Sequence, residues 1–226
     1  MNRRDFLKRS LMATAAGGLL LSGAASSLSE ARGAEHGKEE KMKILVLTGS
    51  PREHGNSNTL ADHFIKGAQE AGHEVFRFDA AQKSVHPCIA CNSCGMDGPC
   101  VFDDDDFALV REHIVSADLV AFVTPMYYFG ISAQLKAVID RFYAINGSIH
   151  TPKQAVLLMT YANNARRDES PMLTHYEVLL DYLGWTDAGR VVAPGVWTEG
   201  SIRNTPFPEQ AYRLGKGLRL KGEGAL

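Results

Sequence analysis

Residues 44–59 read ILVLTGSPREHGNSNT, and this stretch sets the expectation for the whole fold. The apolar run 44–47 has the length of a buried strand, and the Gly/Ser/Pro-rich stretch after it is typical of a loop. A helical pattern follows, in which Leu60, Phe64 and Ala68 share one face. The order strand, loop, helix is the first unit of an alternating α/β domain.

The same alternation continues along the chain. Further strands are expected at 74–78, 119–123, 155–159 and 191–193, with helices at 107–114, 133–145, 171–183 and about 209–218. Parallel neighbours need crossover connections, which helices supply. We therefore predict a doubly wound, three-layer α/β/α domain with a five-stranded parallel sheet in the flavodoxin-like order 2-1-3-4-5. A ligand then lies outside the carboxyl ends of the first and third strands.

The loop after the first predicted strand contains the parts of a phosphate site. The candidate residues supply hydroxyls, an amide and a guanidinium, and they are Ser50, Arg52, Ser57, Asn58 and Thr59. They flank a helix N-terminus, whose free N–H groups bind anions. The loop has neither the spacing of a nucleotide-hydrolase loop nor the G-x-G-x-x-G fingerprint. The alternative is an ordinary helix cap.

The loop after the third predicted strand concentrates aromatic residues. Its candidates for binding a flat heterocycle are Pro125, Met126, Tyr127, Tyr128 and Phe129, and Tyr127 is the best stacking candidate. The loop at 160–164 is a weaker candidate for the other edge of the ring. The alternative is that these aromatic side chains fill the core or a subunit contact.

Together, these two loops resemble those of the NADPH-dependent FMN reductase and iron–sulfur flavoprotein families. The resemblance covers about residues 43–143. It rests on Gly49-Ser50-Pro51-Arg52, on the aromatic loop and on the residues 131–141 that follow it. From residue 151 onward only the fold is similar. The resemblance implies that FMN is the cofactor, with its phosphate in the first loop and its isoalloxazine ring against 125–129. It also implies a homo-oligomer, because FMN in related families lies near subunit contacts.

All four cysteines lie close together, as Cys88-x2-Cys91-x2-Cys94-x5-Cys100, in a predicted insert at 87–101. The spacing Cys-x2-Cys-x2-Cys is typical of ferredoxin-type loops, so we expect one [4Fe–4S] cluster bound by all four thiolates. Iron–sulfur flavoproteins carry a similar motif. The alternatives are a Zn²⁺ site, or disulfides or free thiols in an oxidising compartment. The acidic run 103–106 is interpreted as a helix N-terminus.

The N-terminus resembles a twin-arginine export signal, with Arg3-Arg4 before a short apolar stretch. We predict a signal peptide at 1–34, a linker at 35–41, the FMN-binding domain at 42–200 and a tail at 201–226. Export to the periplasm is expected, with no stable membrane span after cleavage; the alternative is an uncleaved anchor or an amphipathic helix. The net charge of −2 without a basic stripe argues against a nucleic-acid partner.

The expected function is that of an FMN-dependent oxidoreductase. It would move electrons between flavin and a [4Fe–4S] cluster or an external redox partner protein, with either NAD(P)H or a ferredoxin-type protein as donor. The alternatives are an NAD(P)H-dependent FMN or quinone reductase without a cluster, and a flavodoxin-like electron carrier without a small substrate. No acid–base or nucleophilic constellation stands out, which fits chemistry that resides in the flavin.

Overall fold

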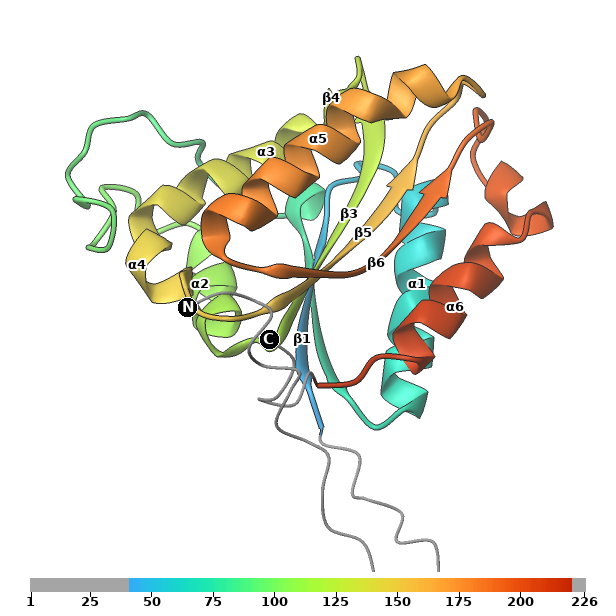
Figure 1. The fold of residues 1–226 in the computed structure, drawn as a ribbon. Helices are drawn as coiled ribbons and strands as arrows, with labels where there is room; N and C mark the ends of the chain where they lie inside the picture. Colours follow the sequence, from blue (N-terminus) through green and yellow to red (C-terminus); the bar gives the residue numbers. More distant parts are fainter. Residues whose placement is uncertain (1–40, 221–226) are drawn as a thin grey trace, which may run out of the picture. The chain divides into compact units, whose positions relative to one another are not determined.

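The computed structural model describes residues 41–220, and within them a parallel sheet lies between two layers of helices (Figure 1). The predicted signal peptide lies outside these residues. The parallel strands of this part are β1 (Lys43–Thr48), β2 (Glu74–Asp79), β3 (Leu119–Tyr127), β5 (Gln154–Thr160) and β6 (Thr186–Ala193). Their order is β2-β1-β3-β5-β6. The predicted three-layer fold and strand order are therefore confirmed, with β5 and β6 as the predicted fourth and fifth strands.

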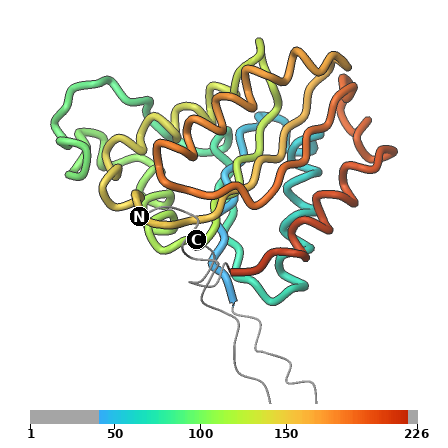
Figure 2. The backbone as a smooth tube through the Cα atoms, viewed as in Figure 1, coloured from blue at the N-terminus to red at the C-terminus, as the bar shows by residue number. Residues whose placement is uncertain are grey.

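Helices cover both faces of the sheet. The α-helices of the described part are α1 (Asn56–Glu70), α2 (Phe107–Ser116), α3 (Ala133–Asp140), α4 (Asn146–Ile149), α5 (Arg166–Leu183) and α6 (Phe207–Lys216). Short 3₁₀ segments lie at η1 (Ala80–Gln82), η2 (Arg141–Ile145) and η3 (Ser201–Asn204). Helices α1 and α6 lie on one face, and α2 to α5 lie on the other (Figures 1 and 2).

The central strands are apolar on both faces because both faces are covered. In β1, Leu45 and Leu47 pack under the layer of α2, α3 and α5, while Ile44 and Val46 pack under α1 and α6. Successive side chains of a strand point to opposite faces, so a continuous apolar run serves two cores at once. This arrangement holds the carboxyl ends of the strands rigidly beneath the loops that follow them.

Helices α1 and α6 approach each other through glycines. A Cβ at Gly67 would lie 2.1 Å from the backbone oxygen of Tyr212, and a Cβ at Gly215 would lie 2.2 Å from that of Phe64. The two backbones are therefore in direct contact. Helix α6 lies in the stretch that the sequence analysis places after the FMN-binding domain, and it forms part of the helical layer over β6.

The structure differs from the sequence-based expectation in several elements. Strand β3 continues to Tyr127, so 125–127 belong to this strand and not to the loop expected there. Strand β6 begins at Thr186 and not at 191, and the short helix α4 was not expected. The helix expected at 133–145 ends at Asp140 and continues as the 3₁₀ segment η2. Helix α5 begins at Arg166 and contains Pro171 in its interior. The two-residue strand β4 (Gly130–Ile131) is too short to leave a pattern in the sequence.

Among the helices of residues 41–220, none combines the length and hydrophobicity that crossing a bilayer requires.

Candidate functional site

A cavity of about 610 Å³ lies where β1, β3, β5 and β6 end. Its walls come from the ends of β3 and β5, the first turn of α1 and the loops that follow the four strands, which is where parallel sheets of this order bind ligands. The volume falls within the range of small-molecule and cofactor sites. The cavity is thus the main candidate for a cofactor site in the described part of the chain.

The cavity brings both predicted loops together. The cavity is lined by Ser50 and Arg52 of the first loop and by Ser57 at the start of α1. All of 125–129 also line it, from the end of β3 and the turn that follows. Asn58 and Thr59 do not line it. The Asn58 amide instead donates to the carbonyl oxygen of Arg52 at 2.9 Å, and the Thr59 hydroxyl donates to that of Gly55 at 3.3 Å. These two side chains therefore hold the shape of the loop.

The first turn of α1 presents donors without acceptors. The N–H groups of Asn56, Ser57 and Asn58 have no acceptor among the described residues, and the Ser57 hydroxyl is buried without a partner. Ser57 lines the cavity, so a phosphate placed there could accept these hydrogen bonds and meet the positive end of the helix dipole. These residues fit the phosphate of FMN.

Gly49, next to the cavity-lining Ser50, joins the end of β1 to the start of α3. A Cβ at this position would lie 2.2 Å from the Ser132 hydroxyl oxygen and 2.6 Å from Cβ of Leu135. The Gly49 N–H also donates to the carbonyl of Val123 at 2.8 Å. The end of β1 is therefore in direct contact with the start of α3, and the phosphate loop and the aromatic loop have a fixed relative position.

The aromatic loop is a strained hairpin turn. Tyr127 pairs with Gly130 across β3 and β4, so Tyr128 and Phe129 form a two-residue turn. Both have positive φ, 47° and 63°, a conformation that costs bulky residues about 1–3 kcal/mol each. The Tyr128 side chain is fully exposed and those of Tyr127 and Phe129 are about half exposed. These rings do not fill the core; the strained turn presents them at the cavity.

Replacing Tyr128-Phe129 with Asn-Gly, the preferred pair for such turns, is expected to stabilise the FMN-free protein by about 1–2 kcal/mol while weakening FMN binding. Thermal unfolding and FMN titration measure the two effects. Tyr128→Phe is the matched control, because it keeps the ring and the strain and should change neither quantity. An Asn-Gly variant of unchanged stability would show that the turn is not strained.

The far wall of the cavity includes residues that the sequence analysis missed. Val196 and Trp197 follow β6, and Trp197 is 77% exposed. The Asn56 amide donates to the carbonyls of Val196 and Thr198 at 3.2 and 2.9 Å, which ties this loop to α1. The signal in the sequence is an aromatic residue just beyond the carboxyl end of the last strand, the edge at which a ligand is expected.

Tyr161 lines the cavity from the loop after β5, which the sequence analysis named as a weaker candidate. Its hydroxyl donates to a carboxylate oxygen of Glu169 at 2.7 Å. Burial, together with this bond and the Glu169 charge, raises the pKa of Tyr161 to about 12. The hydroxyl therefore stays protonated near neutral pH and serves as a hydrogen-bond donor.

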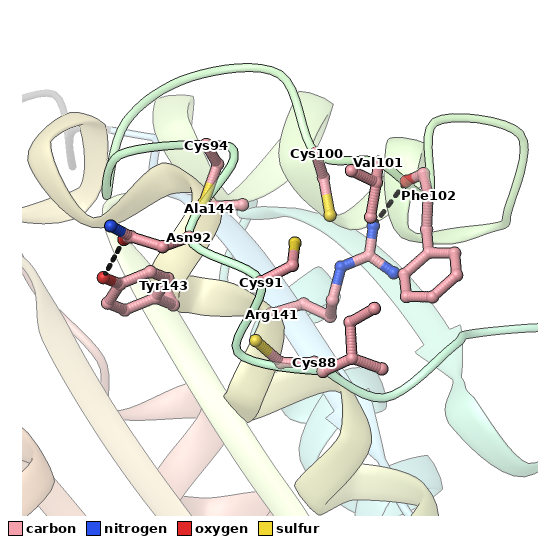
Figure 3. A pocket seen from close by; sticks show the side chains of 11 residues that line it. Cys88, Cys91, Asn92, Cys94, Cys100, Val101, Phe102, Arg141, Tyr143 and Ala144 are labelled. Atoms are coloured by element: carbon pink, nitrogen blue, oxygen red, sulfur yellow. Dashed lines mark hydrogen bonds between the residues drawn. The ribbon is translucent and has the colours of Figure 1, made fainter.

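The four cysteines line a second, smaller pocket (Figure 3). All four are free thiols; Cys88 and Cys91 are exposed, and Cys94 and Cys100 are half-buried. Hydrogen bonds from the backbone and side chain of Ser93 lower the pKa of the Cys91 thiol, which favours its metal-binding thiolate form. The pocket therefore brings four thiol groups, which are soft metal ligands, next to η2.

Within residues 41–220, no three His, Cys, Asp or Glu side chains are placed to share a single metal ion. A single ion needs its donors within bonding distance of one point, whereas a cluster of several atoms spreads its four thiolates over separate corners. The donor set and its convergence on one pocket fit a [4Fe–4S] cluster.

A buried ion pair closes the base of the cysteine segment. A guanidinium nitrogen (Nη1) of Arg141 lies 2.6 Å from a carboxylate oxygen of Asp105, and both side chains are almost fully buried. Arg141 also donates to the carbonyls of His86 and Phe102, at 3.0 and 2.6 Å. Asp105 accepts from the N–H groups of His86 and Phe107, at 2.9 and 3.0 Å. The segment is therefore anchored at both ends.

The bond from Phe107 agrees with the interpretation of the acidic run, because Phe107 is the first residue of α2. Sequence analysis did not identify Arg141. In the sequence, Arg141 is an arginine at the end of an amphipathic helix, and an arginine in this position more often faces solvent.

Comparison with known proteins identifies the family. Residues 42–194 match the family described as NADPH-dependent FMN reductase. The chain belongs to the NADPH-dependent FMN reductase family. Among curated members, an iron–sulfur flavoprotein of Archaeoglobus fulgidus is 35% identical over 177 residues, which cover 75% of this chain and 90% of that protein.

Other relatives of this FMN reductase family member match only part of the chain. An iron–sulfur flavoprotein of Methanocaldococcus jannaschii is 36% identical over 100 residues, covering 44% of this chain and 51% of that protein. For this relative and several other curated iron–sulfur flavoproteins, the chain thus spans about half of the relative's length. Among solved structures, an NAD(P)H:quinone oxidoreductase from Methanothermobacter marburgensis has a TM-score of 0.65 at 19% identity, covering 82% of this chain and 100% of that one, which shows a shared fold.

Proposed function

We propose that the protein is an FMN-dependent oxidoreductase that moves electrons between flavin and a [4Fe–4S] cluster or an external redox partner, with NAD(P)H as a donor. The observation that carries the proposal is the buried Ser57 hydroxyl, which has no partner within residues 41–220, beside free N–H groups in a cavity whose far edge presents aromatic rings. Membership of the NADPH-dependent FMN reductase family supports the same cofactor and donor.

The residues of the cavity divide into two groups by chemistry. At one end, the start of α1 and the Arg52 guanidinium would hold the phosphate, because they supply N–H donors and positive charge. At the other, the backbone of Pro125 to Phe129 and the rings of Tyr127 and Trp197 would enclose the ring system and exclude water from it. FMN supplies the electron chemistry when bound, accepting one or two electrons.

Cys88, Cys91, Cys94 and Cys100 would hold the cluster. Names of relatives support it: several curated proteins that match this chain are called iron–sulfur flavoproteins. A cluster changes its charge by one electron at a time, so a chain that holds both groups can connect two-electron and one-electron donors.

The test is anaerobic purification after expression with the N-terminal segment intact, followed by absorption spectroscopy and assays of iron and acid-labile sulfide. We expect flavin bands, a broad iron–sulfur shoulder and about four irons per chain. Addition of NADPH is expected to bleach the flavin bands. Cys94→Ser is expected to lose the iron and keep the flavin, because the two sites are separate.

Each outcome of this test selects a function. Flavin bands that NADPH bleaches, without iron in the wild type, would instead identify an FMN or quinone reductase without a cluster. Flavin that no small donor or acceptor turns over would identify an electron carrier. Protein that binds no FMN even after reconstitution would contradict the proposal as a whole.

We further propose that the protein is exported to the periplasm and assembles as a homo-oligomer. Arg3-Arg4 before an apolar stretch supports export. The exposed rings of Tyr128 and Trp197 beside the cavity support a contact with another chain, since exposed aromatic clusters mark interaction sites. Cell fractionation and light scattering on the purified protein test the two points, and cytoplasmic or monomeric protein would contradict them.

A further inference from the structure

Arg141 has one side-chain nitrogen without a hydrogen-bond partner among the described residues. Its Nη1 donates to Asp105 and to the carbonyl of His86, and its Nη2 donates to the carbonyl of Phe102. Its Nε–H is buried and has no acceptor among the described residues. A buried donor without an acceptor destabilises a protein, so this one indicates an acceptor that is not among the described residues.

The unused donor lies in the cysteine pocket. Arg141 lines this pocket together with all four cysteines, and Figure 3 shows its guanidinium among their side chains. The cysteines supply sulfur acceptors in this pocket: thiolates, or the sulfides of a cluster that those thiolates hold. Hydrogen bonds to sulfur are one of the ways in which proteins set the potential of such clusters.

The Arg141 guanidinium is fixed by two aromatic rings, a carboxylate and two carbonyl groups. The rings of Phe102 and Phe107 lie over it, with Cζ of Arg141 at 5.6 and 4.7 Å from the ring centroids. Asp105 balances its charge at 2.6 Å, and the arginine side chain is only 2% exposed. With the two carbonyl bonds, these contacts fix the direction of Nε–H, so the donor is preorganised and excluded from water.

We propose that Arg141 is a positioning residue of the cysteine site whose Nε–H donates to a sulfur of the bound cluster and raises its reduction potential. The proposal rests on the proposed function, because it assumes that the four cysteines hold a cluster. The Asp105 carboxylate has the opposite effect: it balances the arginine charge and so keeps the potential lower than an unpaired guanidinium would. The pair thus sets the potential through two terms of opposite sign.

The experiment compares Arg141→Lys with Asp105→Asn, in protein purified with FMN and cluster. The measured quantities are iron and sulfide per chain, and the midpoint potential from titration followed by electron paramagnetic resonance. Arg77→Lys is the control, since Arg77 is a partly buried arginine paired with two carboxylates, Asp62 and Asp79, and does not line the cysteine pocket.

We expect Arg141→Lys to make the cluster harder to reduce, with at least a tenfold lower reduced-to-oxidised ratio at a fixed potential; a tenfold change is 59 mV for a one-electron couple. We expect Asp105→Asn to shift the potential in the opposite, positive direction. Arg77→Lys should match the wild type. Opposite signs are the distinguishing result, because a loosened segment would affect both variants alike.

Other outcomes also decide the matter. If Arg141→Lys loses its iron while Asp105→Asn keeps it, the donor is needed to hold the cluster, which supports the proposal. Equal iron loss in both variants, shifts of the same sign, or an unchanged potential in Arg141→Lys would overturn it and leave the proposed function intact. Wild-type protein without iron would overturn it together with the cluster itself, and is recognised before any variant is made.

Discussion

Ser57→Asp is expected to raise the dissociation constant for FMN at least 100-fold, which corresponds to about 2.7 kcal/mol of binding free energy. Ser57 lies in the first turn of α1, buried, with a hydroxyl that has no partner among residues 41–220. A carboxylate in its place would take up the free N–H groups itself and repel the phosphate dianion. The fold should persist, because an acidic residue in the first turn of a helix interacts favourably with the dipole.

Riboflavin separates the phosphate site from the ring site. It lacks the phosphate, so its affinity should be the same in Ser57→Asp and in the wild type, while the affinity for FMN falls. Ser57→Ala is the milder control, with an expected loss of roughly tenfold from one hydrogen bond to a charged group. Fluorescence titration measures the affinities of the wild type and both variants for FMN and for riboflavin. Equal losses for riboflavin and FMN would show that the variant damages the cavity as a whole.

Gly67→Ala is expected to destabilise the protein by about 2 kcal/mol, although the same change in an isolated helix stabilises it by about 0.5–1 kcal/mol. The reason is the contact with α6, where the new Cβ would lie 2.1 Å from a backbone oxygen of Tyr212. A backbone group cannot rotate away as a side chain can, so α6 must move off the sheet. Overpacking of this kind costs about 1–3 kcal/mol or more.

Urea denaturation of the FMN-free protein measures this effect. Gln69→Ala is the control, because Gln69 is exposed on the same helix and its replacement should change the free energy of unfolding by less than about 0.5 kcal/mol. Gly215→Ala should repeat the effect from the opposite side, since its Cβ would meet the backbone oxygen of Phe64. A stabilised Gly67→Ala would mean that α1 and α6 do not touch.

The sequence was sufficient for the fold because the fold depends on local patterns. Apolar runs such as 44–47 and helical spacing such as that of Leu60 and Phe64 are visible over a few residues, and parallel strands with crossover helices follow from their alternation. The two main loops of the cavity could also be predicted, since their position after the first and third strands is enough to bring them together.

The remaining parts of the site depend on contacts between distant residues. Trp197 reaches the cavity only because the Asn56 amide holds its loop against α1. Arg141 is buried only because Asp105 and the carbonyls of His86 and Phe102 meet it there. The positive φ of Tyr128 likewise could not be predicted from the sequence, since the residues that favour this turn are Asn and Gly. Such features become visible only when the chain is folded.

The length of helix α3 fixes the orientation of the FMN cavity relative to the cysteine pocket. It starts after Ser132, against Gly49, the neighbour of the cavity-lining Ser50, and ends before Arg141 in the cysteine pocket, with eight residues between Ser132 and Arg141. One inserted residue would turn everything beyond it by about 100° and advance it by about 1.5 Å. Either Ser132 or Arg141 would then face the wrong way. Insertions and deletions can accumulate in the surrounding loops, but the length of this helix has to stay constant.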